Sequence, residues 1–309
     1  MIITKTNEFN SPLKLKKFAA IDVGSNAIRV LISNIIESKE GVYFQKNALV
    51  RAPIRLGEDS FTLGEISKKN IKRMVKAMRA FKLLMKVHGV SHYQAFATSA
   101  LREANNSIEV IDHVKKKAGI KIEIIDGRKE AEVISYSKLS EFLNSQKTFL
   151  FVDVGGGSTE FTIIDEGKRI SSKSFKIGTV RLINDLVDDR VWKAIQGWIE
   201  KNAKPYRKIT LIGSGGNINK LFKLSNIKEG KPLSLIKLNQ IYLELESLTY
   251  EERLLKFELN PDRADVIIPA AKIYLKSLEW SGGQKIYVPK FGLSDGMIKY
   301  MYKNGKKKI

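Results

Sequence analysis

The stretch FLFVDVGGGSTEFTII, residues 149–164, decides the fold, because it joins two apolar runs through a turn made almost entirely of small residues. It reads as a strand, a glycine-rich turn that begins at Asp153, and a second strand. The same order opens the chain, where FAAIDVGSNAIRVLISNII occupies residues 18–36. A third apolar run follows each pair, over residues 42–50 and 169–175. The repeated order predicts an internally duplicated architecture.

Outside these stretches, helical patterns alternate with short apolar runs, which is typical of an α/β protein. The longest helix is predicted over residues 66–87, where apolar residues recur at helical spacing. We place the domain boundary so that residues 1–130 and 131–309 form separate domains. The remaining predicted elements are strands over 93–97, 122–125 and 209–212 and helices over 108–117 and 128–143.

The charge of the chain points to an anionic partner. There are 54 Lys and Arg residues against 33 Asp and Glu, so the formal net charge is +21. Such an excess suits nucleic acid, phosphorylated substrates or an anionic membrane surface. Nucleic acid has little support as a partner, because no motif that reads nucleic acid is present. One face of the 66–87 helix, with Lys72, Lys76, Arg79, Lys82 and Lys86, is either a solvated surface or a groove wall for an anionic polymer.

The amino-acid composition limits the kinds of catalytic nucleophile and metal site that this protein can have. Cysteine is absent and only three histidines occur, which excludes disulfides and a cysteine nucleophile and disfavours an imidazole metal site. A metal would be held by carboxylates and waters, which favours Mg²⁺ or Mn²⁺. No signal-peptide core opens the chain, and no segment has the ~20 apolar residues of a membrane span. We therefore expect a cytoplasmic protein that does not bind a membrane.

Glycine-rich turns follow three of the predicted strands and suit phosphate binding. Glycine lets the backbone approach a phosphate oxygen, and successive N–H groups form an anion-binding nest. The third turn also opens a helix, whose N-terminus attracts anions. The candidate phosphate-binding residues in these turns are Gly24, Ser25, Asn26, Gly155, Gly156, Gly157, Ser158, Thr159, Gly213, Ser214, Gly215 and Gly216.

Carboxylates accompany the turns. Asp22 and Asp153 each end a strand, and Glu160 follows the second turn. Because buried carboxylates without partners are costly, we predict a divalent cation held by Asp22, Asp153 and Glu160 together with phosphate oxygens. Glu130 lies in the first turn of a predicted helix. From its position alone, it either complements the helix dipole or acts as a catalytic carboxylate.

These motifs together resemble the exopolyphosphatase / guanosine pentaphosphate phosphatase family, within the actin–Hsp70–sugar kinase superfamily. The Asp-x-Gly-Gly-Gly-Ser-Thr-Glu run is specific, and the matches follow the family order from about residue 18 to 296. The matching stretches are residues 20–26, 97–104, 126–131, 153–160, 177–182, 213–216 and 263–267.

The resemblance implies two actin-like, ribonuclease H-like domains, each with a mixed five-stranded sheet flanked by helices, and an active-site cleft between them. A C-terminal helix over residues 296–309 is expected to pack back on the first domain. The implied reaction is Mg²⁺-assisted attack of water on a phosphoanhydride, which releases terminal phosphate from inorganic polyphosphate or guanosine pentaphosphate. The resemblance also implies a homodimer.

The resemblance assigns roles to particular residues. Glu130 matches the glutamate that activates the attacking water. Asp153 and Glu160 match carboxylates that organise Mg²⁺ and the nucleophile. Arg29 and Arg102 match basic positions near the substrate.

The sequence departs from the family pattern at two positions that bear on the site. Ser294 stands where arginine is usual, so one phosphate contact is expected to be lost, and Asp126 stands where serine is common. Two other functions stay open: a superfamily kinase that uses ATP, and a non-catalytic protein that binds polyphosphate or an alarmone. Glu130 and the stretch over residues 97–104 favour the phosphatase.

Overall fold

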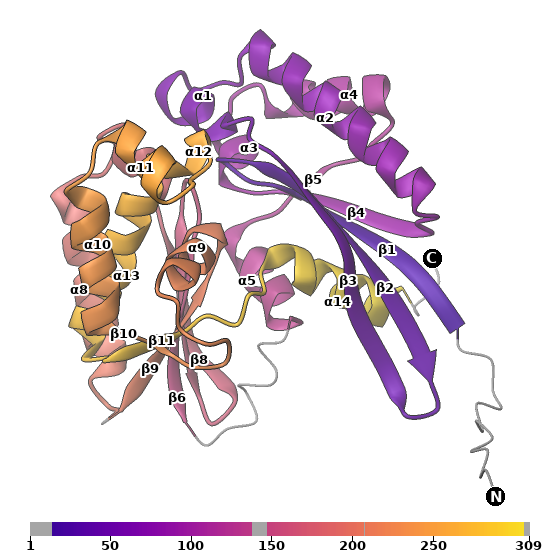
Figure 1. The fold of residues 1–309 in the computed structure, drawn as a ribbon. Coiled ribbons are helices and arrows are strands. Elements are labelled where there is room, and N and C mark those ends of the chain that lie inside the picture. The colour runs from indigo at the N-terminus through magenta and orange to yellow at the C-terminus, as the bar shows by residue number, and fades with distance from the viewer. Residues whose placement is uncertain (1–13, 138–146, 207, 306–309) are drawn as a thin grey trace, which may run out of the picture.

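The computed structural model describes residues 14–137, 147–206 and 208–305, which form two mixed sheets flanked by helices (Figure 1). The strands of the first sheet are β1 (Lys14–Val23), β2 (Ile28–Ser38), β3 (Gly41–Ala52), β4 (His92–Ala97) and β5 (Glu123–Ile124). Those of the second sheet are β6 (Thr148–Val154), β7 (Thr159–Asp165), β8 (Lys168–Phe175), β9 (Ile209–Ser214), β10 (Leu233–Ser234) and β11 (Lys285–Tyr287).

The two sheets repeat one topology, as the duplicated sequence pattern predicts. Their strand orders are β3-β2-β1-β4-β5 and β8-β7-β6-β9-β11-β10. Each begins with a three-stranded antiparallel meander and continues with a strand parallel to its first strand, β4 beside β1 and β9 beside β6. The α/β architecture with two mixed sheets is therefore confirmed.

The second sheet has six strands, one more than the five expected. The additional strand, β10, pairs antiparallel with β11 through Leu233 and Ser234. Two residues are too short to leave an alternating pattern in the sequence, so only the pairing across the fold reveals this strand.

Helices cover both faces of each sheet. The first sheet with α1 to α4 is called the first lobe below, and the second sheet with α7 to α13 the second lobe. The helices are α1 (Leu56–Thr62), α2 (Lys68–Val87), α3 (Ser99–Glu103), α4 (Ser107–Ala118), α5 (Gly127–Ser135), α7 (Thr179–Ile183), α8 (Asp189–Ala203), α9 (Gly216–Leu224), α10 (Leu235–Glu246), α11 (Tyr250–Lys256), α12 (Pro261–Ala264), α13 (Ile267–Ser281) and α14 (Leu293–Asn304).

The core follows from the alternation of side chains along β1. Ala19 and Ile21 point into a cluster beneath α2 and α4. Phe18 and Ala20 point the other way, into a cluster formed with α5, α14 and residues of the second sheet such as Phe149. The helices α5 and α14 therefore lie between the two sheets, and their shared core joins the two lobes (Figure 1).

The two helices between the sheets differ from their predicted extents. The helix predicted over 128–143 is described as α5, which ends at Ser135, and residues 138–143 lie outside the described residues. The C-terminal helix begins at Leu293 and packs on β1 and α5 as far as Asn304, whereas residues 306–309 are outside the described part. Within the described ranges, none of the helices combines the length and hydropathy that crossing a membrane requires.

Candidate active site

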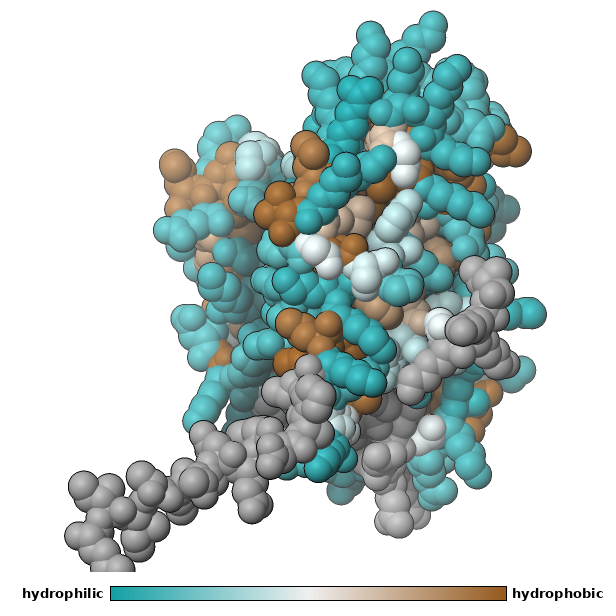
Figure 2. Space-filling model, turned by 90° about the vertical axis from the view of Figure 1, so that its right-hand side faces the viewer, coloured by the Kyte–Doolittle hydropathy of each residue, from teal (hydrophilic) through white to brown (hydrophobic). Residues whose placement is uncertain are grey.

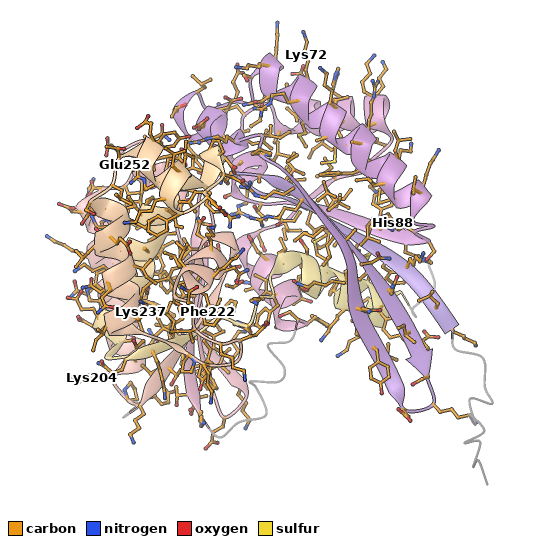
Figure 3. The ribbon with its side chains drawn as sticks, in the orientation of Figure 1. Lys72, His88, Lys204, Phe222, Lys237 and Glu252 are labelled. Atoms are coloured by element: carbon orange, nitrogen blue, oxygen red, sulfur yellow. The ribbon has the colours of Figure 1, made fainter. Side chains whose placement is uncertain are left out.

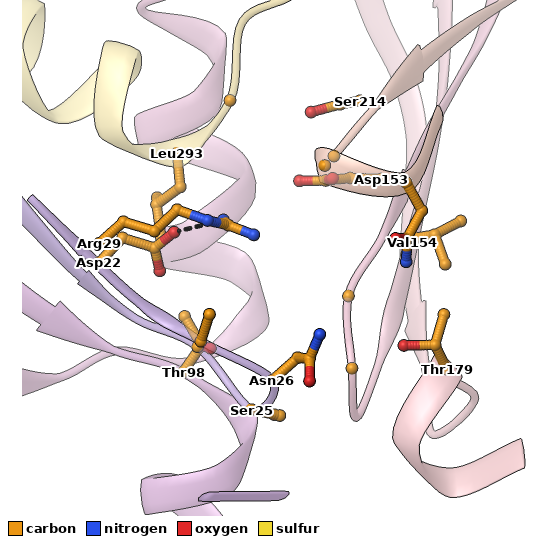
Figure 4. Close-up of a pocket in the computed structure, with 18 of the residues that line it drawn as sticks. Asp22, Ser25, Asn26, Arg29, Thr98, Asp153, Val154, Thr179, Ser214 and Leu293 are labelled. Carbon is orange, nitrogen blue, oxygen red and sulfur yellow. Dashed lines mark hydrogen bonds and ion pairs between the residues drawn. The ribbon is translucent and has the colours of Figure 1, made fainter. Parts of the chain in front are cut away.

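The glycine-rich turns of the two lobes meet at one cleft, with the β1–β2 side facing the turns of the second lobe (Figure 4). Helix α5 contributes Glu130 to the same cleft. The sequence-predicted residues that line it are Asp22, Gly24, Ser25, Asn26, Arg29, Glu130, Asp153, Gly155, Gly156, Ser158, Ser214, Gly215 and Gly216.

Strand register places the charged residues at the ends of the two hairpins. On β1 and β2, Asp22 is paired with Arg29, whose Nη1 lies 3.0 Å from an Asp22 carboxylate oxygen. On β6 and β7, Asp153 is paired with Glu160. The hairpins thus present an acid–base pair from the first lobe and an acid–acid pair from the second.

The turns are glycine-rich because the backbone segments pass close to one another. A Cβ added at Gly156 would lie 2.8 Å from the Ser25 Cβ, across the junction of the lobes. Gly215 has a φ of 114°, which side chains rarely allow, and it directly precedes α9. The N-terminus of α9 therefore faces the cleft and favours a bound anion there.

Helix α5 positions Glu130. The Asp126 carboxylate caps the helix by accepting a hydrogen bond of 2.7 Å from the Lys129 backbone N–H. This cap fixes the start of the helix, so that Glu130 lies in its first turn with its side chain buried. Asp126 therefore performs the capping role that a serine at this position would also perform.

Four carboxyl groups gather around the end of the cleft. Burial and the neighbouring charges of Glu160 and Asp153 raise the pKa of Glu130 well above its usual range. Burial, followed by the Glu160 charge, raises the pKa of Asp153 to about 7. Burial raises the pKa of Asp22 although Arg29 opposes the shift. Their mutual repulsion leaves this end of the cleft in need of a cation or a proton.

Glu160 lies behind the cleft and does not line it. Its Oε1 accepts hydrogen bonds from the Ser158 and Ser174 hydroxyls at 2.7 and 2.9 Å. It borders a separate, mainly apolar cavity with Phe151 and Ile164, and burial raises its pKa. Its negative charge nevertheless raises the pKa values of Glu130 and Asp153, so Glu160 influences the cleft without lining it.

Four other predicted residues also lie off the cleft. Arg102 donates from Nη1 to the Ile125 carbonyl at 2.6 Å, at the segment that leads into α5. Thr159 donates to the Ile177 carbonyl at 2.7 Å and is fully buried. Gly157 faces Phe61 of the first lobe, and Gly213 faces the core around Ile286. These four residues support the segments around the cleft but do not line it.

Two arginines that the sequence analysis did not assign line the cleft beside Arg29. They are Arg51, at the end of β3, and Arg263, in α12. Burial, and then repulsion from Arg51 and Arg29, lowers the pKa of Arg263 to about 10. Arg263 belongs to a stretch that the family resemblance marks, whereas Arg51 carries no local signal and reaches the cleft only through its register opposite Arg29.

The remaining unassigned residues at the cleft are small, polar or aliphatic: Ala27, Thr98, Ser99, Val154, Thr179, Asn217, Gly292 and Leu293. Ser294 is buried in the first turn of α14 and borders an adjoining cavity with Arg29, Arg51 and Arg263. Arginines from three other elements therefore supply positive charge next to the position where the family usually has arginine.

Ion pairs join the two lobes beside the cleft. Arg51 pairs with Asp262, and the Arg55 Nη1 lies 2.6 Å from the Asp265 carboxylate. Next to the second turn, the Arg181 Nη2 lies 2.6 Å from the Glu103 carboxylate. These contacts join the two lobes on either side of the cleft.

The site suits a hard divalent cation that takes part of its coordination from the substrate. In the described part of the chain, no three acidic or histidine side chains are close enough to hold an ion alone. The Glu130 Oε2 is buried without a hydrogen-bond partner, and carboxylate oxygens are the donors that Mg²⁺ prefers. The set Asp22, Asp153 and Glu160 stays a prediction, completed by phosphate oxygens and waters.

The sequence matches the profile of the Ppx/GppA phosphatase family over residues 35–304. Exopolyphosphatase 1 of Mycobacterium tuberculosis is 24% identical over 305 residues, which cover 91% of this chain and 87% of that protein. A bifunctional 3-dehydroquinate synthase/phosphatase of Fusobacterium nucleatum is 28% identical over 87% of this chain, which spans only 44% of that longer protein.

Solved structures show the same fold. An exopolyphosphatase from Cytophaga hutchinsonii matches with a TM-score of 0.80 and 26% identity, covering 94% of this chain and 98% of that one. A Ppx/GppA family member from Aquifex aeolicus has a TM-score of 0.74 and 25% identity, with 96% and 100% of the chains covered. The resemblance read from the motifs is thereby confirmed.

Proposed function

Because the chain belongs to the Ppx/GppA phosphatase family, we propose that its cleft hydrolyses the terminal phosphoanhydride bond of inorganic polyphosphate. One observation carries the proposal. A buried glutamate with an unpartnered oxygen, Glu130, lies in the same cleft as three glycine-rich turns and three arginines. That combination provides a base for water and a cradle for phosphate at the same place.

The arginines and turns bind the phosphates. Arg29, Arg51 and Arg263 repel one another, and a polyanion between them relieves that repulsion. The N-terminus of α9 adds further positive potential. The catalytic demand in phosphoryl transfer is mainly positioning and neutralisation of charge, which this arrangement meets.

Glu130 orients the attacking water and accepts its proton. Its raised pKa makes it a stronger base than an exposed glutamate once it is ionised. The water oxygen forms a bond to the terminal phosphorus while the bond from phosphorus to the bridging oxygen breaks. The products are orthophosphate and a polyphosphate shorter by one unit, which keeps the electron pair of the broken bond.

Mg²⁺ fits the acidic end of the cleft, with Asp153 and Asp22 as the nearest lining carboxylates and Glu160 behind them. When bound, it would offset the charge of the phosphates and polarise the anhydride. Burial and then the Glu160 charge raise the pKa of Asp153 to about 7, and a bound cation would favour its ionised form. Removal of divalent ions with EDTA is expected to stop phosphate release, and added Mg²⁺ to restore it.

The lining of the cleft favours a bare phosphate chain over a nucleotide. None of the described residues that line it is aromatic, so no ring is offered for a guanine base to stack on. Guanosine pentaphosphate is the second substrate to compare. A kinase or a purely binding protein would release no orthophosphate from polyphosphate.

Formation of a homodimer stays a prediction, and light scattering of the purified chain tests it.

Substitution of the base tests the proposed function. We expect Glu130→Gln to lower phosphate release from polyphosphate by about 10²- to 10⁴-fold, because general-base catalysis contributes that much. The matched control is Glu132→Gln on the same helix, whose side chain is 45% exposed and pairs with Lys129. Wild-type rates in Glu130→Gln would refute the assignment of the base, and the same loss in Glu132→Gln would indicate damage to α5.

A further inference from the structure

Helix α2 carries a basic face that the proposed reaction does not use. Its 20 residues include eight Lys or Arg and no Asp or Glu. At about 100° per residue, six of the eight fall within an arc of about 120°. This set, called the α2 basic face, consists of Lys68, Lys72, Lys76, Arg79, Lys82 and Lys86.

The charges of this face are not neutralised by the protein. None of its six residues forms an ion pair with a described residue. Arg79 donates only to a backbone carbonyl, that of Lys117, at 2.9 Å. Like charges three and four residues apart on a helix repel one another. The face therefore gains stability from any anion that lies along it.

The neighbouring helix extends the positive surface. Lys115, Lys116 and Lys117 are exposed in the last turn of α4, which packs beside α2. The acidic residues of α4 are Glu109 and Asp112, nearer its start. Figure 2 shows mainly hydrophilic side chains at the top of the view, where these helices lie, and Figure 3 shows Lys72 on the outer side of α2.

On the basis of the proposed function, we propose that the α2 basic face is an exosite for the distal part of a long polyphosphate whose end occupies the cleft. The six side chains recur every three to four residues over a rise of about 27 Å, which matches an extended linear polyanion. The aromatic residue of α2, Phe81, is buried, so the face offers no ring for a nucleobase. Recognition would rest on charge alone.

The face begins close to the cleft. Arg73, next to Lys72, donates from its guanidinium to the carbonyls of Pro53 and Ile54 at 2.7 and 3.0 Å. These residues directly follow the end of β3, which carries the cleft residue Arg51. From there α2 leads away from the second lobe (Figure 1). The start of α2 is therefore fixed to the segment that directly follows Arg51, so a polyphosphate that leaves the cleft past Arg51 is directed towards this helix.

A charge-matched pair of variants tests the exosite. The variant Lys72→Gln/Lys76→Gln/Lys86→Gln removes three charges from the face. The control Lys193→Gln/Lys201→Gln/Lys204→Gln removes three charges from the second lobe, two from α8 and one from its C-cap residue. We expect the α2 variant to raise KM for long-chain polyphosphate about tenfold and to flatten the salt dependence by about two logarithmic units per decade of salt. KM for tripolyphosphate, and kcat for both long-chain polyphosphate and tripolyphosphate, should stay within twofold of the wild-type values.

Each contrary outcome has a defined meaning. Equal effects of the two triple variants would show that net charge alone acts, and an unchanged KM for long-chain polyphosphate would overturn the exosite. Weakened binding to a DNA duplex or to anionic vesicles, with KM for long-chain polyphosphate unchanged, would assign the face to those partners instead. If the wild type releases no phosphate from either substrate, the proposed function fails, and binding of fluorescent long-chain polyphosphate then tests the face alone.

Discussion

Asp153 on β6 and Glu160 on β7 are directly paired across the hairpin of the second lobe, at the position where the first lobe pairs Asp22 with Arg29. Burial and then the Glu160 charge raise the pKa of Asp153, whereas Arg29 opposes the rise that burial causes at Asp22. One repeated hairpin thus provides a carboxylate with an arginine partner on one side of the cleft and a carboxylate with an acidic partner on the other. The charges of this acid–acid pair, together with burial, raise the pKa of Glu130.

The acid–acid pair predicts the pH dependence of the rate. Glu130 must be ionised to accept a proton, and its raised pKa means that activity is lost at a higher pH than an ordinary glutamate would give as the pH falls. Glu160→Gln removes the largest charge acting on Glu130, so the acid limb of the pH profile should move to lower pH. Profiles of kcat/KM for both proteins measure this, and coincident acid limbs would contradict it.

The same pair predicts an effect on stability. The pKa of Asp153, about 7, lies above its usual value of 3.8, so its contribution to stability is present at low pH and is lost as the pH rises through about 7. In EDTA at pH 8, Asp153→Asn should raise the free energy of unfolding by about 2 kcal/mol, reduced from the full shift because the side chain is partly accessible. Urea unfolding at pH 8 and at pH 4 checks this, since the gain should vanish at the lower pH.

The arginine cluster predicts a loss of substrate binding. Arg263→Gln should raise KM for polyphosphate about 10- to 100-fold, because a hydrogen bond to a charged group contributes about 1.5–3 kcal/mol. Free-protein stability should change little, because relief of repulsion from Arg29 and Arg51 offsets the lost hydrogen bond from Arg263 to the Gly216 carbonyl. The control Arg190→Gln removes an arginine whose side chain is 89% exposed. A similar change of KM in both variants would count against a specific contact at Arg263.

The cap of α5 links helix stability to catalysis. Asp126→Ala removes the acceptor for the Lys129 N–H and should cost about 1 kcal/mol in the free energy of unfolding. Because Glu130 lies in the same turn, kcat should fall as well. Asp126→Ser should restore both, since serine is also a good N-cap. Thermal unfolding and phosphate release are measured on the same preparations. A normal kcat in Asp126→Ala would show that the N-cap of α5 does not affect the reaction.

The local pattern of the sequence determined the strands, the turns and most of the phosphate cradle. Strand predictions over residues 18–36 and 148–164 hold because alternating apolar residues and a run of glycines leave few other conformations. The same runs place Asp22 and Asp153 at strand ends, since an acid next to a glycine turn cannot continue a buried strand without cost.

Only the tertiary structure decided which of these residues share the cleft and what charge they carry there. Register brings Arg51 opposite Arg29 without any local pattern in the sequence, and packing of α12 brings Arg263, from the matching stretch 263–267, into the same cleft. The same packing moves Glu160 behind the cleft. Proton affinity and cavity lining depend on distances between segments far apart in the chain, and burial sets the strength of those interactions.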